Sequence, residues 1–215
     1  GTEPMLGTNP IAFAAPSDMD FPFSFDGATS ISQRGKIEVA LRAEKPVPEG
    51  WVIDAEGGPM TDPAAIMAGL DRAMAALLPL GGAGELFAGY KGYDLATMVE
   101  IFSAAFQNGA YLSMLHDTDH EGNTQFLRIG HFFLAINVEH FIPLDEFKHI
   151  TGNMMRELRA SRRGADQARI YTAGEKEYWN TLRVQKEGVE VAPGVQKALW
   201  TLREELSITG YDLGF

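Results

Sequence analysis

The stretch FLRIGHFFLAINV, residues 126–138, predicts the clearest strand of the chain. Apolar residues occur on both faces of this predicted strand, as expected for an interior strand that is covered on both sides. An amphipathic helix is predicted after it, over residues 144–163, and an apolar helix before it, from Tyr93 to Phe106. A buried strand between two such helices indicates a sheet that helices cover on both faces.

Arg128 and His131 lie within this predicted strand and point to opposite faces, because neighbouring side chains of a strand alternate. A guanidinium among apolar neighbours needs an anionic partner. That partner is either a protein carboxylate or the carboxylate of a ligand, and the sequence leaves both open.

The rest of the chain alternates between short strands and helices. Ser30, followed three residues later by Gln33, has the spacing of a capping box, and Asp62-Pro63 is a typical helix start. Strands are predicted at residues 11–15, 21–25, 51–53 and 170–171. Further helices are predicted at residues 30–45, 64–78, 175–187 and 194–206. The fold class is therefore α/β.

The composition excludes several classes of protein. The 215 residues include 18 basic and 29 acidic side chains, a formal charge of −11, and the basic residues form no strong cluster in the sequence. We therefore expect no nucleic-acid partner. The chain has no cysteine, which excludes disulfides and thiolate metal sites and suits the cytoplasm. No apolar run is long enough to cross a bilayer, so no membrane partner is expected.

A glycine-rich loop, residues 80–92, precedes the helix at Tyr93 and places Lys91 just before it. Glycines allow a close backbone approach to a ligand, and the start of a helix attracts phosphate. The loop matches neither the P-loop nor the Rossmann fingerprint, and a plain linker is an equal interpretation. The turn Asp26–Ser30 is a second phosphate candidate, although a simple helix cap is favoured locally.

Two other chemistries receive little support. His116 and His120 have the residue types of a metal site, but a solvated acidic loop is the favoured interpretation, so no metal is expected. The chain contains no Gly-x-Ser-x-Gly nucleophile motif.

Seven blocks of the sequence, taken together and in order, resemble the type-2 malate/L-lactate dehydrogenase family. These blocks are GTNPIAF (7–13), DGATS (26–30), RGKIEVA (34–40), PEGW (48–51), TDP (61–63), LPLGG (78–82) and KGY (91–93). The resemblance implies a hydride transfer between NAD or NADP and a small 2-hydroxy or 2-oxo acid. It also implies a homodimer and a three-layer, non-Rossmann fold with a mixed, largely antiparallel sheet.

The resemblance also assigns roles to residues. The cofactor is expected at Ala28, Thr29, Ser30, Lys91, Gly92, Thr172, Gly174 and Glu175. Arg128 is expected to bind the substrate carboxylate. Residues 1–165 are expected to form the cofactor-binding domain. Residues 166–215 are expected to form a C-terminal helical segment that packs with an N-terminal helical region absent from this chain.

The sequence departs from the family pattern at several points. Ala173 replaces a proline, Asp94 replaces a common glycine, and the stretch from Gly81 to Lys91 is expanded. The family's proton-transferring histidine precedes the block at residue 7, so we expect the general acid/base upstream of Gly1. The chain is then a fragment that lacks the catalytic region. The alternative is a catalytically inactive family member that acts as a binding or assembly partner.

Overall fold

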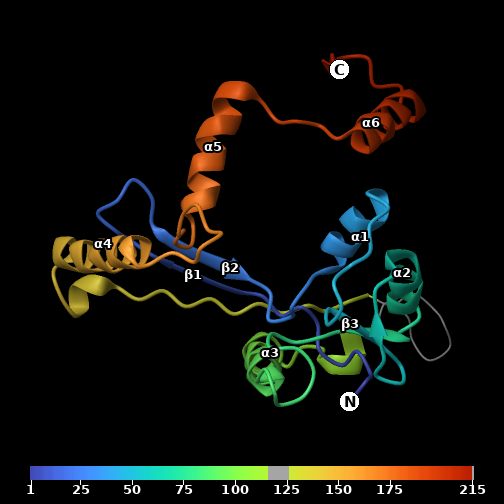
Figure 1. The fold of residues 1–215 in the computed structure, drawn as a ribbon, viewed down its shortest axis with the longest axis horizontal. Coiled ribbons are helices and arrows are strands. Elements are labelled where there is room, and N and C mark those ends of the chain that lie inside the picture. Colours follow the sequence, from blue (N-terminus) through green and yellow to red (C-terminus); the bar gives the residue numbers. More distant parts are fainter. Residues whose placement is uncertain (116–125, 215) are drawn as a thin grey trace.

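The computed structural model describes residues 1–115 and 126–214. They form a mixed α/β structure with two small antiparallel sheets, and all the pairings between these strands are antiparallel (Figure 1). Strands β1 (Ile11–Ala15) and β2 (Phe23–Gly27) form the first sheet. Strands β3 (Val52–Asp54), β4 (Pro59–Met60) and β5 (Ala75–Leu77) form the second, in the order β4-β3-β5.

The β1–β2 hairpin confirms the two strands predicted near the start of the chain. Ile11 pairs with Gly27 and Ala15 with Phe23, so the second strand begins two residues later than predicted. In Figure 1 this hairpin links the part that carries α4 (Leu144–Ala160) and α5 (Glu175–Glu187) to the part that carries the second sheet.

The second sheet packs with α1 (Arg34–Arg42) and α2 (Pro63–Asp71) around the apolar core. Ile37, Val52 and Ile66 are completely buried there. Asp62 caps α2 as predicted, accepting hydrogen bonds from the amides of Ala64 and Ala65. The capping box of α1 does not form, because the Ser30 hydroxyl donates to the Ser32 carbonyl instead.

The helix predicted to run to residue 78 ends at Asp71, and this prediction was wrong. The chain reverses at Ala73, which has a positive φ of 55°, and Ala75–Leu77 then pairs with β3. Alanine favours a helix, but burial of Ala75 and Ala76 in the sheet overrides that local preference. A strand therefore precedes the glycine loop, where the sequence indicated a helix.

The strand predicted at residues 126–138 does not form in the structure. Residues 126–137 have no regular secondary structure, and residues 138–140 form a short 3₁₀ helix. Figure 1 shows this segment crossing the molecule as an extended trace. Phe126 is 92% exposed and Phe133 is 89% exposed. A strand requires hydrogen-bond partners along its edges, and no strand of the described residues pairs with this segment.

The remaining helices follow the sequence closely. Helix α3 (Gly89–Ser103) begins four residues earlier than predicted, and α4 ends three residues earlier. Helices α5 and α6 (Pro193–Glu205) lie where they were predicted, whereas residues 170–171 form no strand. Among the described residues, none of the helices has the length and apolar character that a bilayer crossing requires.

Candidate functional site

The first candidate segment, Ala28–Ser30, continues directly from β2 and lies against the glycine loop. The amide of Leu80 donates to the Thr29 carbonyl at 2.9 Å, and Ser30 forms a bridge with Pro79. Thr29 is buried, and its hydroxyl donates to the carbonyls of Thr8 and Asn9. The Thr29 side chain therefore stabilises this turn through hydrogen bonds within the chain. A ligand here would contact Ala28 and Ser30, which are half-buried.

The second candidate segment, Lys91-Gly92, lies in the first turn of α3 and not before the helix as predicted. Gly92 is buried against Leu80, and a Cβ atom at this position would collide with the Leu80 backbone. Since Leu80 also bonds to Thr29, the structure brings the first and second candidate segments together. The ammonium of Lys91 is exposed beside the Tyr90 ring.

A hydrogen-bond network that the sequence did not reveal holds this arrangement. The Asn9 side-chain amide donates to the Ala96 carbonyl and to the Glu100 carboxylate, both at 2.9 Å. Glu100 is nearly buried and also accepts from the amide of Leu112. Glu100 lies two helical turns after Gly92 on the same face of α3. This spacing was the signal in the sequence that Glu100 faces the same neighbours as Gly92.

The third candidate segment, Thr172–Glu175, lies against the other end of β2. The amide of Ser24 donates to the Ala173 carbonyl at 3.2 Å. Gly174 has a φ of 88°, and a Cβ atom there would lie 3.0 Å from the Pro22 carbonyl oxygen. Glycine therefore suits this position both for its backbone conformation and for the close approach. It allows α5 to begin beside the strand.

Glu175, the first residue of α5, is completely buried and is held by the chain itself. Its Oε1 atom forms an ion pair with Arg159 at 3.1 Å and accepts hydrogen bonds from Arg169 and, at 3.4 Å, from the Trp179 indole. Its Oε2 atom accepts from the Thr172 amide. The carboxylate is thus fully engaged by protein groups, and a cofactor would meet the surrounding backbone and not this side chain.

One buried hydroxyl at each end of β2 lacks a hydrogen-bond partner in the described part of the chain. These groups are the Ser32 Oγ atom, close to the first segment, and the Thr172 Oγ1 atom, in the third. A buried polar group without a partner is costly, so such groups indicate a missing ligand or water. From Ser24 to Thr29 the chain advances five residues, roughly 16 Å at the rise of a strand.

Arg128 is not brought to these segments. The adjacent residues 128–130 pass the C-terminal end of α3, where Gly130 contacts the Ser103 carbonyl. Lys91 lies twelve residues earlier in α3, about 18 Å along the helix axis. Arg128 is exposed in an extended segment and not set in the apolar strand that was predicted. Its role toward a substrate carboxylate stays a prediction.

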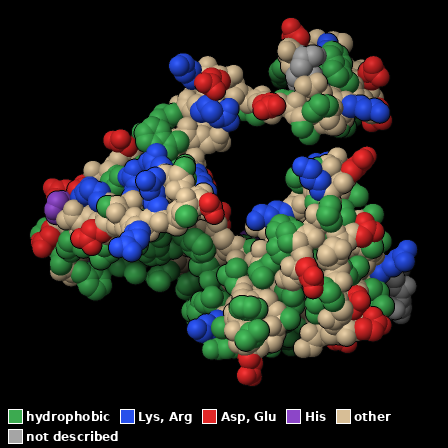
Figure 2. All heavy atoms as spheres, viewed as in Figure 1, with side chains coloured by type: hydrophobic (Ala, Val, Ile, Leu, Met, Phe, Trp, Pro, Cys, Tyr) green, Lys and Arg blue, Asp and Glu red, His purple; other side chains and the backbone are tan. Residues whose placement is uncertain are grey.

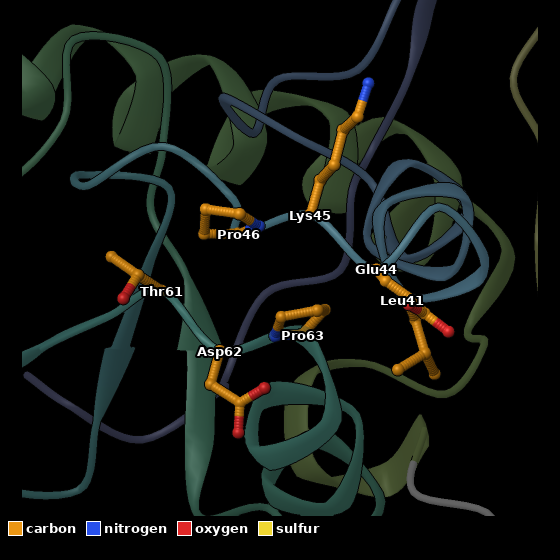
Figure 3. A pocket seen from close by; sticks show the side chains of 7 residues that line it. All are labelled: Leu41, Glu44, Lys45, Pro46, Thr61, Asp62 and Pro63. Atoms are coloured by element: carbon orange, nitrogen blue, oxygen red, sulfur yellow. The ribbon is translucent and has the colours of Figure 1, made fainter.

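Figure 3 shows a separate pocket of about 410 Å³ between the end of α1 and the start of α2, lined by Leu41, Glu44, Lys45, Pro46, Thr61, Asp62 and Pro63. The Asp62 carboxylate caps α2 here, so it serves the fold. Across the described residues, no group of three or more potential ligands could hold a metal ion. His116 and His120, the metal candidates, lie outside the described residues.

Comparison with known proteins identifies the family of this chain. Residues 1–200 match the family model described as malate/L-lactate dehydrogenase, and the chain belongs to this family. The malate dehydrogenase of Pyrococcus horikoshii is 40% identical over 210 residues, which are 98% of this chain and 56% of that protein. The chain thus spans little more than half the length of the curated relatives that it matches along its whole length.

Two further relatives bear on the fold and on the cofactor. The crystal structure of malate dehydrogenase from Entamoeba histolytica superposes with a TM-score of 0.90 and 38% identity, covering 97% of this chain and 57% of that one. A relative named (2R)-3-sulfolactate dehydrogenase (NADP(+)), from Chromohalobacter salexigens, is 38% identical over 141 residues, 66% of this chain and 38% of that protein. The recognised family resemblance is therefore confirmed.

Proposed function

We propose that this chain forms the nicotinamide-binding part of an NAD(P)-dependent oxidoreductase that interconverts small 2-hydroxy and 2-oxo acids. The observation that carries the proposal is the arrangement along β2. The start of α3 lies near one end and the start of α5 lies at the other, and a buried hydroxyl close to each end lacks a partner among the described residues. An extended dinucleotide can span the roughly 16 Å between them.

The residues present fit such a cofactor. The first turn of α3 offers the positive end of a helix dipole, and Lys91 adds an exposed ammonium. Ala28 and Ser30 line the adjoining turn. Thr172 and Gly174 border the start of α5, where the buried Thr172 hydroxyl lacks a partner among the described residues. When bound, the nicotinamide would accept or supply the hydride.

The remaining roles complete the proposal. Arg128 would hold the substrate carboxylate through paired N–H donors, since a planar guanidinium matches a carboxylate. No residue of this chain is proposed as the general acid or base. The proposal includes a cytoplasmic homodimer, the three-layer arrangement, a cofactor domain over residues 1–165, and a helical segment over residues 166–215. No observation favours the alternative of a catalytically inactive binding partner.

Titration of the whole natural protein with NADH and NADPH, followed by fluorescence, tests this function. Lys91→Ala should raise the cofactor Kd about tenfold, because it removes one charge-assisted contact. Lys45→Ala, which removes an exposed lysine from the pocket of Figure 3, is the matched control and should leave the Kd unchanged. An unchanged Kd in Lys91→Ala would reject the role of Lys91. If neither nucleotide binds the unmodified protein, the proposed function is wrong.

A turnover assay then addresses the substrate. Malate, lactate, sulfolactate and cyclic imino acids, each with both cofactors, form a suitable panel. Arg128→Gln should raise KM for the acids far more than Kd for the cofactor. The expected contrast follows because residues 128–130 pass the C-terminal end of α3, whereas Lys91 lies in its first turn.

A further inference from the structure

Asn9 links the turn after β2 to helix α3, and it does so through two different groups. Its backbone carbonyl accepts a hydrogen bond from the Thr29 hydroxyl at 3.1 Å. Its side-chain amide donates at 2.9 Å to the Ala96 carbonyl and to the Glu100 carboxylate, which both belong to α3. Lys91 lies in the first turn of the same helix. The bonds of this one residue therefore determine where the turn at Thr29 lies relative to Lys91.

The Glu100 carboxylate accepts the Asn9 amide in a nearly buried position. Only 9% of Glu100 is exposed, and its other oxygen accepts from the Leu112 amide at 2.8 Å. Figure 2 shows hydrophobic side chains gathered over α3 and the adjoining end of the hairpin. A hydrogen bond to a carboxylate is strong, and apolar surroundings reduce the competition from water. The contact between Asn9 and Glu100 is therefore a firm attachment of α3.

The structure requires an amide at position 9 more than it requires a particular shape. The backbone of Asn9 has a positive φ of 36°, which asparagine and aspartate tolerate better than most residues do. Both bonds to α3 use the side-chain nitrogen as the donor. An aspartate has nearly the same size but offers no donor when it is ionised. Exchange of the two residue types therefore isolates the contribution of the donor.

We propose that Asn9 is a positioning residue of the cofactor site. It holds α3 against the turn at Thr29, and it thereby keeps Lys91 and the half-buried Ser30 in the relative position that one dinucleotide requires. This inference rests on the proposed function and adds a residue to which the family resemblance assigns no role. Asn9 acts without touching the cofactor, because its amide is engaged by α3. Displacement of a binding group by about 1 Å is enough to impair a site.

Asn9→Asp in the whole natural protein tests the inference, because it removes the donor with little change of shape. The variant places two carboxylates at a contact of 2.9 Å, where they cannot both be charged without cost. The Kd for NADH or NADPH, measured by fluorescence titration, should rise about tenfold. Asn108→Asp is the matched control, since Asn108 is exposed and also has a positive φ, of 51°. It should leave the Kd unchanged.

A reciprocal exchange shows whether the bond itself is responsible. Glu100→Gln alone should also raise the Kd, because an amide donor then faces either the Asn9 amide or the Leu112 amide. In Asn9→Asp/Glu100→Gln the introduced glutamine can donate to the introduced aspartate and still accept from Leu112. The Kd should return to within about threefold of the unmodified protein. A double variant that is folded by circular dichroism but regains no affinity would contradict the inference.

Combination with Lys91→Ala separates positioning from a merely structural role. If Asn9 acts through the position of Lys91, Asn9→Asp should raise the Kd about tenfold when Lys91 is present and less than about twofold in Lys91→Ala. Equal losses in both backgrounds, or an unchanged Kd in Asn9→Asp, would overturn the inference and leave the proposed function intact. If the unmodified protein binds neither NADH nor NADPH, both proposals are wrong.

Discussion

The two ends of β2 hold the nearby starts of α3 and α5 by different physical means. At Thr29 the contacts are between backbones, and Gly92 allows α3 to approach Leu80 closely. At Ser24 the contacts lead to a buried carboxylate, Glu175, that two guanidinium groups hold. The packing at the first end requires a residue without a side chain, Gly92. The packing at the second end requires a buried carboxylate whose charge the two arginines balance. Substitutions at the two ends should therefore fail in different ways.

The largest effect is expected at the charged end. Glu175→Gln should lower the free energy of unfolding by about 3 kcal/mol, because it leaves Arg159 and Arg169 without their common carboxylate. This loss of stability is at the low end of what a broken buried ion pair costs, because both arginines are partly exposed to water. Urea unfolding followed by circular dichroism measures the change.

Glu177→Gln is the matched control for this variant. Glu177 lies in the same first turn of α5 and is exposed, so the same loss of charge should change stability little. Equal destabilisation by the two variants would show that the helix dipole, and not the buried ion pairs, is what Glu175 serves.

The glycine end should respond to volume. Gly92→Ala is expected to cost about 1–3 kcal/mol, because the added Cβ meets backbone atoms of Leu80 that have little room to move. The same change should weaken cofactor binding, since it displaces the glycine loop from the start of α3. Thermal unfolding and a cofactor titration together measure both effects.

Gly35→Ala should have the opposite effect on the stability of the protein. Gly35 lies in α1 with no atom within 4 Å of a Cβ atom there and without a positive φ. Alanine should stabilise this helix by about 0.4–1 kcal/mol. If Gly92→Ala proved as well tolerated as Gly35→Ala, the close packing of α3 on Leu80 would be wrong.

The elements that the sequence predicted well are those whose signals are local. The Asp62-Pro63 cap, the β1–β2 strands and helix α5 depend on neighbouring residues and were confirmed. The failures depend on distant partners. Ala75–Leu77 became a strand because β3 lies beside it, and the apolar run 126–137 lacks any strand that pairs with it in the described residues.

The candidate site follows the same division. Block resemblance indicated three candidate segments. The structure places Ala28–Ser30 and Thr172–Glu175 at the two ends of β2, with Lys91-Gly92 beside the first of them through Leu80. The sequence could not show that the side chains of Thr29 and Glu175 already have partners within the chain. Those partners are Thr8, Arg159 and Arg169, which are distant in the sequence from the residue that each contacts or lie outside its segment. The cluster of Arg156, Arg159 and Arg169 was missed for the same reason. Its residues meet only when the loop after α4 folds back on the helix.

The smallest expected effect concerns the ion pair between Asp18 and Arg156. Hydrogen bonds from Arg156, with a smaller contribution from His149, lower the pKa of Asp18 from 3.8 to about 2. Because the folded-state pKa lies below the unfolded value, this pair stabilises the fold above about pH 4. Its contribution is lost as the pH falls through about 2. Neutral-pH stability should therefore not depend on small changes of pH through this group.

An NMR titration of the Asp18 carboxyl carbon checks the assignment. Arg156→Gln should move the midpoint upward toward 3.8, whereas Arg162→Gln should leave it at about 2. A midpoint that stays at about 2 in Arg156→Gln would mean that another cation sets the charge of Asp18.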